Sequence, residues 1–385
     1  MAAPGIAPIS VQFDGTAGPS NGGTQGLLSA MLRATDQISD LIFSPGRPPQ
    51  VEVNGHLIAI DAPGLHALSA DDTRRIAADL IGSNKQAITM LREQGSCDIS
   101  YGLPGLARFR VNVFIQRGSC AVVMRVIPTT LPTFSTLGIP AQLQDVSELR
   151  DGIVLVTGAR GSGKSSTLAA LLNRINEQQT CHIITIEDPI EFLHNHKRAT
   201  IHQRELHSDT PSFAQAIRAA LRQAPRVIVV GEVRDREIME MLLEAAETGH
   251  LVLSTVNTVD ATKTVERVVG SFPPSEQATV RSRIAKTLRY VISQRLIPRA
   301  NGAGRVAAYE ILKSGPHTYS VLEKGDSELA TLLDVMKSGA AGMQHFDGEI
   351  IKLVRAGVIN LDNAVAYASD PVQLRSMMRT AALGH

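Results

Sequence analysis

The chain of 385 residues is 43% hydrophobic and 19% charged, with 38 Lys and Arg against 37 Asp and Glu, for a net charge of +1. This size and composition predict a folded protein of two or three globular domains and exclude a disordered or fibrous chain. The neutral charge gives no overall reason to expect nucleic acid or an anionic membrane as a partner, and the 4% aromatic content argues against a stacking platform for single-stranded nucleic acid.

The cysteines and the apolar runs bear on the compartment. Cys97, Cys120 and Cys181 lie far apart without a CxxC pair, so neither a disulfide framework nor a zinc site is indicated. No run approaches the roughly 18 consecutive apolar residues of a membrane-spanning helix, and the N-terminus lacks a signal-peptide pattern. We therefore expect a cytosolic protein that is recruited to a membrane if it works at one.

The N-terminal part divides into a tail and a first domain. Residues 1–25 are rich in Gly, Pro, Ala and Ser and predict a disordered tail. Residues 26–127 begin with an amphipathic helix in "GLLSAMLRATDQ" and continue with alternating strands, where Asn54-Gly55 marks a tight hairpin. Helix and strand signals mixed in this way predict an α+β domain.

Two local signals refine this domain and its end. Ser69 and Asp72 have the spacing of a capping box at a helix N-terminus, and a short turn near Gly118 separates two further strands. Residues 128–144 contain three prolines and no long hydrophobic period, which predicts a linker.

After this linker the pattern changes to buried strands that alternate with helices. The strands are the runs "GIVLVTG", "HIITIED", "RVIVVGE" and "HLVLSTV". Val, Ile and Leu runs between helices predict a parallel sheet covered on both faces, over residues 145–300. Residues 301–385 are predicted to be mostly helical, after a hairpin around "RLIPRANGAGRVAAYEIL".

A phosphate-binding loop follows the first of these strands. "GARGSGKS", residues 158–165, matches GxxxxGK[ST] between a strand and a helix. Glycines let backbone N–H groups converge on phosphate oxygens, Lys164 can reach the β- and γ-phosphates, and Ser165 can ligate Mg²⁺. The residues expected to bind the nucleotide are Gly158, Gly161, Ser162, Gly163, Lys164, Ser165 and Ser166.

Hydrolysis needs two further acidic functions, one for the metal's water shell and one for the attacking water. Glu232 follows the strand "RVIVVG" and is a candidate for the first. Glu187, Asp188 and Glu191 follow "HIITI" at the same edge of the predicted sheet and are candidates for the second. The pattern does not choose among the three, and a solvated turn remains the alternative.

These motifs together resemble a known family. "VLVTGARGSGKSSTLAALL", "IITIEDPIEF", "VIVVGEVRD" and "AAETGHLVLST", in this order, resemble the type IV pilus retraction (twitching motility) ATPases of the secretion ATPase superfamily, over roughly residues 27–365. The resemblance implies a RecA-like P-loop ATPase core, an N-terminal PAS-like domain, a homo-hexamer, ATP and Mg²⁺, and docking from the cytoplasm onto an inner-membrane platform protein. Contact with nucleic acid is not expected.

The resemblance also assigns residues. It makes Glu191 the catalytic glutamate with Glu187 and Asp188 in support, and it places Glu232 in the Walker B element beside the metal. The implied nucleotide-sensing arginines and the histidine near the γ-phosphate are Arg108, Arg110, Arg125 and His250.

The chain departs from the family pattern at several positions. Asn257 stands where the family has a second histidine, Ala224 and Arg226 replace acidic residues before the Walker B strand, and Ile42 replaces a histidine. The C-terminal region reads "GPHTYSVLEKGD" where retraction ATPases carry "AIRNL", and its ending leans toward the accessory retraction paralogue.

These features leave three functional hypotheses open. The first is an ATP-hydrolysing hexameric motor for type IV pilus retraction. The second is a weakly catalytic accessory ATPase that modulates a paralogous motor, and the departures motivate it. The third is a DNA translocase or the ATPase of a related secretion or conjugation system, because the same core serves them all.

Overall fold

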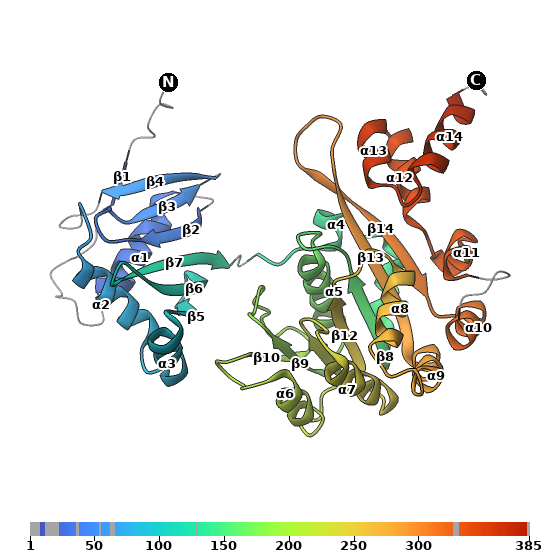
Figure 1. The fold of residues 1–385 in the computed structure, drawn as a ribbon, viewed down its shortest axis with the longest axis horizontal. Coiled ribbons are helices and arrows are strands. Elements are labelled where there is room, and N and C mark those ends of the chain that lie inside the picture. The colour runs from blue at the N-terminus through green and yellow to red at the C-terminus, as the bar shows by residue number, and fades with distance from the viewer. Residues whose placement is uncertain are drawn as a thin grey trace. The chain divides into compact units, whose positions relative to one another are not determined.

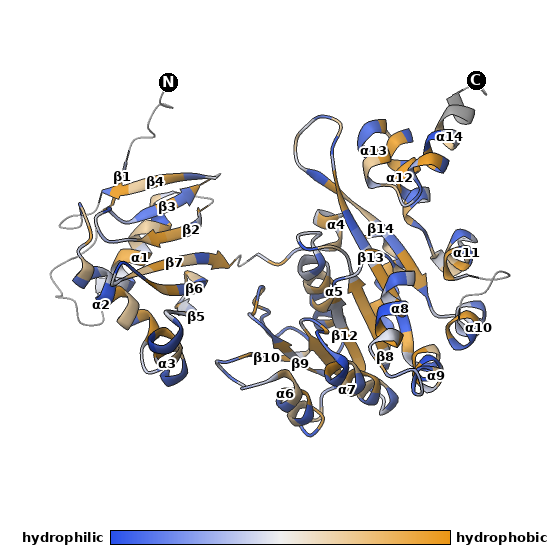
Figure 2. Ribbon diagram, viewed as in Figure 1, coloured by the Kyte–Doolittle hydropathy of each residue, from blue (hydrophilic) through white to orange (hydrophobic). Residues whose placement is uncertain are grey.

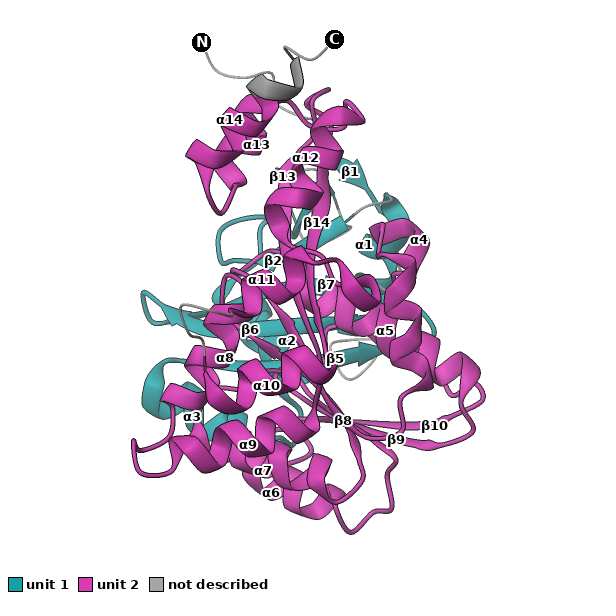
Figure 3. Cartoon of the chain, turned by 90° about the vertical axis from the view of Figure 1, so that its right-hand side faces the viewer, with its two compact units in different colours: residues 1–130 teal, residues 131–385 magenta. Residues whose placement is uncertain are grey.

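The computed structural model divides the chain into two compact units, residues 1–130 and 131–385 (Figure 3). Figure 1 shows both units as a ribbon with most of their helices and strands labelled. The structure describes residues 8–11, 23–35, 38–53, 55–61, 66–127, 130–325 and 331–382, without the side chains from 379 onward.

The first unit is a seven-stranded sheet with three helices. The strand order is β1-β4-β3-β2-β7-β6-β5, and the pairs are antiparallel except for β1 with β4. The strands are β1 (Ile9–Ser10), β2 (Ile38–Phe43), β3 (Gln50–Val53), β4 (His56–Asp61), β5 (Ser96–Leu103), β6 (Ala107–Gln116) and β7 (Ser119–Ile127), and the helices are α1 (Gly23–Ala34), α2 (Ala70–Ile81) and α3 (Lys85–Gln94).

Alternation along the strands puts one face of this sheet into the core. Phe109 and Val111 on β6 are fully buried and share a hydrophobic cluster with Leu28 of α1 and Leu80 of α2. Arg110, which lies between them on the strand, is exposed. Strand residues point alternately to the two faces, so one face carries the helices and the other carries polar side chains.

Two predictions for this unit are confirmed. The Ser69 hydroxyl accepts a hydrogen bond from the Asp72 N–H at 3.1 Å, and Asp72 accepts from the Ser69 N–H at 2.8 Å, so the capping box opens α2. The Ser69 hydroxyl, which donates to Asp72 Oδ2 at 2.6 Å, and the Ser69 backbone N–H lower the pKa of the Asp72 carboxyl. The hairpin between β3 and β4 is present, although Asn54 itself lies outside the described residues.

Two expectations about irregular segments need correction. Ile9 and Ser10, in the expected disordered tail, pair with β4, and Val11 is buried, because two apolar side chains close the sheet edge there. The expected linker 128–144 contains the helix α4 (Phe134–Leu137) and most of a 3₁₀ helix, η1 (Ala141–Glu148). Leu143 and Val146 are fully buried against the second unit's core, which fixes this segment by packing.

The second unit contains the predicted parallel sheet, in the order β10-β9-β11-β12-β8-β13-β14, with β14 antiparallel. Figure 2 shows apolar residues along its central strands. The elements are β8 (Gly152–Thr157), α5 (Lys164–Gln178), β9 (His182–Glu187), β10 (Thr200–Glu205), α6 (Phe213–Ala220), β11 (Val227–Val230), α7 (Arg236–Glu247), β12 (Leu251–Val256), α8 (Ala261–Gly270), α9 (Gln277–Thr287), β13 (Leu288–Pro298) and β14 (Arg305–Lys313).

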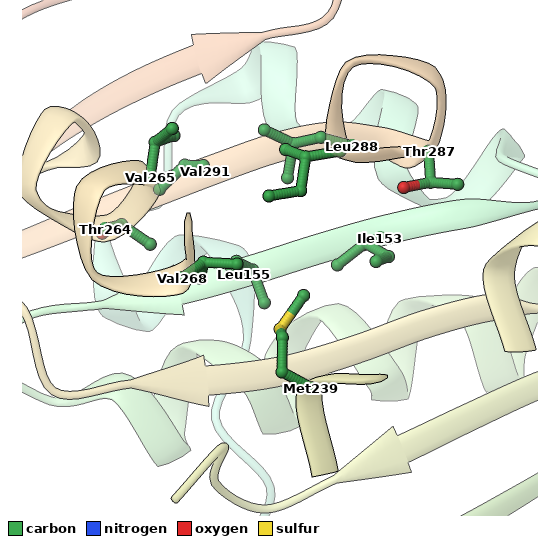
Figure 4. A pocket seen from close by; sticks show the side chains of 10 residues that line it. Ile153, Leu155, Met239, Thr264, Val265, Val268, Thr287, Leu288 and Val291 are labelled. Atoms are coloured by element: carbon green, nitrogen blue, oxygen red, sulfur yellow. The ribbon is translucent and has the colours of Figure 1, made fainter. Parts of the chain in front are cut away.

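Helices cover both faces of this sheet. Ile153 and Leu155 of β8 pack in a cluster with α6 to α9, whereas Val154 and Val156 pack with η1 and α5. All six residues of β8 are buried, as expected for a strand in the middle of a doubly covered parallel sheet. A small apolar pocket lies between β8 and helices α7, α8 and α9, and Figure 4 shows its lining of aliphatic side chains, including Met239. The lining has no charged side chain, and the hydroxyls of Thr264 and Thr287 donate to backbone carbonyls.

The C-terminal region begins at the predicted hairpin, where β13 and β14 pair from Tyr290 opposite Lys313 to Pro298 opposite Arg305. Its remaining elements are helical, as expected: α10 (Pro316–Lys324), α11 (Leu332–Lys337), η2 (Ala340–Gly342), α12 (Phe346–Arg355), α13 (Leu361–Tyr367) and α14 (Pro371–Ala382). Among the described residues, no helix combines the length and hydropathy that a membrane crossing requires.

A buried carboxyl on β14 should make stability depend on pH. Glu310 is 2% exposed, accepts a hydrogen bond from the Ala261 N–H at 2.8 Å, and has a pKa that burial raises from 4.5 to about 7. Folding therefore favours the protonated form of Glu310. The contribution of this group to the free energy of unfolding is fully present below about pH 4.5 and is lost as the pH rises through about 7. We compare the free energy of unfolding of Glu310→Gln with that of the wild type. The difference in favour of the variant should be larger at about pH 8 than at about pH 5, by on the order of 2 kcal/mol.

Urea unfolding of both proteins at the two pH values measures this difference. Glu266→Gln is the control, because Glu266 is half-exposed and pairs with Lys263 on the surface of α8. An equal effect of Glu310→Gln at both pH values would contradict the prediction.

Candidate active site

The phosphate-binding loop connects β8 to α5 at the carboxyl edge of the parallel sheet. Gly158, Gly161 and Gly163 have φ angles of 150°, 74° and 90°, a region that side chains disfavour. A Cβ on Gly158 would overlap the Ser162 hydroxyl, and one on Gly163 would lie 2.9 Å from the Gln294 amide nitrogen. These close approaches explain why glycine occupies both positions.

The groups inside the loop suit the phosphates of a nucleotide. Within the described residues, the buried Ser162 hydroxyl has no hydrogen-bond partner, and no side chain caps the N-terminus of α5. The Lys164 ammonium donates to the carbonyls of Gly158 and Ala159, each at 2.9 Å, which leaves it one N–H. Unpartnered donors at a helix N-terminus favour an anion, so the loop fits the nucleotide that the sequence predicts.

The charge environment of Lys164 links the loop to two of the predicted carboxylates. Burial is the main cause that lowers the pKa of Lys164, and Arg160 lowers it further. The charges of Glu232 and Glu191 raise it in opposition. The fold thus brings one residue after β11 and one after β9 within electrostatic range of the loop lysine.

Glu232 is held from two sides. The Asn257 side-chain amide donates to Glu232 Oε1 at 2.5 Å. On the other side, Arg234 Nε lies 4.0 Å from Glu232 Oε2, and the Arg234 guanidinium forms an ion pair with Asp188 at 3.0 Å. Arg234 also lies over the Phe213 ring at 5.3 Å. Arg234 therefore joins the carboxylates that follow β9 and β11.

Glu187 is fully engaged by its neighbours. Its Oε1 accepts hydrogen bonds from the Thr185 hydroxyl at 2.6 Å and from the Gln203 amide at 3.0 Å, and its carboxylate also accepts from the backbone N–H of Glu191. Burial nevertheless raises the pKa of Glu187. This geometry is that of a carboxyl group that fixes a turn.

Glu191 is the carboxylate of this turn that remains free. Its side chain is exposed and has no hydrogen-bond partner among the described residues. The turn itself is anchored, because the Ile190 N–H donates to Glu205 Oε2 at 3.1 Å and the Ile190 side chain is buried. A free carboxylate thus projects from a backbone that is held in place.

The expectation that His250 lies near the γ-phosphate is wrong for this chain's own loop. His250 precedes β12, and its carbonyl accepts a hydrogen bond from Gly152 at the start of β8, whereas the loop follows Thr157 at the strand's other end. Six residues of strand separate the two ends by about 20 Å. The His250 ring bonds to the Ala245 carbonyl at 2.9 Å, which is a structural role.

The three predicted arginines lie on strands of the first unit. Arg125 of β7 pairs with the buried Asp40 at 2.9 Å, so its guanidinium neutralises a carboxylate within the first unit. Arg110 of β6 lies opposite Arg125 in the strand register and is exposed. Arg108 is two residues earlier on the same strand face and is half-buried.

Several residues that shape the site carry no prediction from sequence. Arg234 lies within the quoted "GEVRD" motif, and Gln203 lies on β10, a strand that the periodicity does not indicate. Gln294 on β13 accepts a hydrogen bond from Thr167 of α5 at 2.6 Å and so supports the loop from the opposite side. The sequence signal that could have identified Arg234 is a basic residue placed between two acidic ones, Glu232 and Asp235.

Comparison with known proteins gives concordant matches. Residues 97–345 match the family model described as "Type II/IV secretion system protein". The type IV pilus retraction ATPase PilT of Pseudomonas aeruginosa is 42% identical over 86% of this chain and 95% of its own length. The type IV pilus ATPase PilU of the same organism is 37% identical over 89% of this chain and 88% of its own. The crystal structure of the pilus retraction motor PilT with bound ADP superposes with a TM-score of 0.80 at 38% identity, over 88% of this chain and 95% of that one.

Proposed function

The chain belongs to the type II/IV secretion system protein family as an ATPase related to the pilus retraction ATPases, and on that premise we propose that it is the hexameric motor of type IV pilus retraction. The observation that carries the proposal is the meeting of Lys164, Glu191 and Glu232 at one sheet edge. This set supplies the phosphate clamp and the two acidic functions that phosphoryl transfer to water requires.

In this proposal the loop binds ATP and orients it. Backbone N–H groups from Gly161 to Ser166 and the Lys164 ammonium hold the phosphates, and Ser162 donates its unpartnered hydroxyl. Ser165 and Glu232 would hold Mg²⁺, whose charge offsets that of the β- and γ-phosphates. The Ser165 hydroxyl has no other hydrogen-bond partner in the described part of the chain, which supports this assignment.

Glu191 is the residue that we assign to the attacking water. Asp188 is engaged by Arg234 and Glu187 by three donors, so both are occupied in holding the site. The Glu191 carboxylate is available to accept a proton from water beside the γ-phosphate. The N-terminal arginines Arg108 and Arg110 remain proposed partners of the nucleotide, whereas Arg125 is committed to Asp40.

We place the motor at the cytoplasmic face of the inner membrane, where it acts on the platform protein of the pilus. The name of the Pseudomonas relative, a type IV pilus retraction ATPase that aligns over 95% of its length, supports the role in pilus retraction on which this placement rests. A second candidate, an accessory ATPase that assists a paralogous motor, is favoured by one observation. Asn257, which replaces a family histidine, contacts Glu232 directly, so the departure lies inside the site.

A deletion strain tests the proposed direction of movement. A strain that lacks this protein is expected to keep surface pili and to lose twitching, because assembly continues without retraction. Expression of the wild-type chain should restore twitching, and Lys164→Ala should fail to restore it. Loss of surface pili would indicate an assembly role instead. Full rescue by Lys164→Ala in the presence of a paralogue would favour the accessory role.

A further inference from the structure

We propose that Asn257 is a positioning residue that orients the Glu232 carboxylate through a neutral hydrogen bond, so that the full negative charge of Glu232 faces the phosphate site. This inference rests on the proposed function and assigns a role to a residue at which the chain departs from its family. The contact itself is the amide of Asn257 donating to Glu232 Oε1 at 2.5 Å.

The strand register brings the two residues together. β11 and β12 are parallel neighbours with Val230 beside Ser254, so the segments that follow both strands leave the same edge. Glu232 comes two residues after β11, and Asn257 comes directly after β12. β12 runs two residues beyond the level at which β11 ends, so Asn257, directly after β12, and Glu232, two residues after β11, reach nearly the same level above the sheet.

Asn257 is a fixed donor because its surroundings are anchored. Its backbone carbonyl accepts a hydrogen bond from Arg267 of α8 at 3.3 Å. The next residue, Thr258, is buried and forms a hydroxyl hydrogen bond with Thr264 at 2.6 Å. Two residues of α8 thus hold the backbone that directly follows β12 and carries the Asn257 amide.

A neutral donor matters here because a charged one is close by. Arg234 lies 4.0 Å from the other oxygen of Glu232 and already pairs with Asp188 at 3.0 Å. If the Glu232 side chain turned toward Arg234, a full ion pair would neutralise the charge that acts on Lys164. The bond from Asn257 keeps one oxygen in place without adding positive charge, which leaves the carboxylate's remaining lone pairs for the metal's water shell.

Three substitutions separate this role from simple packing. Asn257→Leu removes the donor and keeps the volume approximately. Asn257→Asp keeps the shape, removes the donor and adds a like charge. Asn257→His keeps an N–H donor at the position, and assays at about pH 8.5 keep its imidazole neutral. We expect kcat to fall about tenfold or more in the first two variants, with the KM for ATP changing less than about threefold, and Asn257→His to retain most of the wild-type kcat.

A binding measurement gives a readout that is independent of turnover. Titration of the full-length protein with a fluorescent ATP analogue in EDTA should give the same affinity for wild type and all three variants. The magnesium chloride concentration that gives half of the metal-dependent gain in affinity should rise severalfold for Asn257→Leu and Asn257→Asp. Asn173→Asp is the matched control, because Asn173 donates to Glu177 at 3.1 Å near the middle of α5 and away from the loop.

The outcomes distinguish the proposal from its premise. Wild-type kcat and an unchanged magnesium requirement in Asn257→Asp would overturn the positioning role, even if Asn257→Leu fails to fold. Equal losses in Asn257→His and Asn257→Leu would overturn it too, since the donor would then be irrelevant. A wild-type protein without ATPase activity, but with intact nucleotide binding, would instead count against the proposed function.

Discussion

Lys164→Ala is expected to lower kcat/KM for ATP hydrolysis by about 10²–10³ and to weaken nucleotide binding, because it removes the loop ammonium that we assign to the phosphates. In the structure its ammonium donates to the carbonyls of Gly158 and Ala159 at the mouth of the loop. Burial lowers the pKa of Lys164, so binding an anion relieves part of the cost of holding that charge in the protein. The variant lacks both the charge and the donor.

The measurement combines steady-state ATPase kinetics with nucleotide titration of purified protein. Lys197→Ala is the control, because Lys197 lies in the same unit and pairs with Glu177 at 2.7 Å on the surface. A surface ion pair contributes on the order of 0–1 kcal/mol, so the control should keep its activity. Lys164→Ala with kcat/KM within about threefold of wild type would contradict the assignment of the loop.

The phosphate loop could be predicted from the sequence because its signal is local. The eight residues 158–165, the strand before them and the helix after them all follow from one continuous stretch, and β8 and α5 are found where expected. The parallel sheet follows likewise from continuous apolar runs. Local signals are sufficient where each residue's neighbours in space are also its neighbours in the chain.

The ranking of the three carboxylates depends on contacts that no local pattern carries. Gln203 and Glu205, which hold the turn, come from β10, a polar strand whose periodicity does not mark it as part of the sheet. The error at His250 has the same origin. His250 and Asn257 are close in the sequence, but the six-residue strand β12 lies between them, so His250 is at the end of the strand that is far from the site. A sequence pattern predicts the strand or helix to which a residue belongs. The pairing and direction of the strands then determine at which edge of the sheet that residue lies.

The N-terminal errors have a different cause, which is composition. The segment around Ile9 is poor in large apolar residues as a whole, yet Ile9 and Val11 are enough to add a short strand to an existing edge. The linker composition of residues 128–144 likewise conceals Leu143, which is fully buried. A few apolar residues suffice when a neighbouring surface is already formed, and composition averages cannot show this.

Glu191→Gln is expected to lower kcat by about 10²–10⁴ while leaving the affinity for ATP within about threefold of wild type, because a glutamine of the same shape cannot accept the proton of the attacking water. The backbone there should not move, since the Ile190 N–H is held by Glu205 and the Glu191 N–H by Glu187. Single-turnover kinetics with saturating enzyme measure the chemical step directly.

Glu187→Gln and Asp188→Asn are the matched controls, because each neutralises a neighbouring carboxylate to which we assign no role toward the attacking water. Burial raises the pKa of Glu187, so its surroundings already disfavour the charged form. A neutral amide of equal size in Glu187→Gln should therefore lower kcat less than tenfold, and only because the turn is held less firmly. Asp188→Asn weakens the ion pair with Arg234, which also lies near Glu232, so its loss should be intermediate and accompanied by a higher magnesium requirement. If Glu187→Gln abolished hydrolysis and Glu191→Gln did not, the half-buried Glu187 carboxyl would be the base, and the exposed Glu191 would have no chemical role.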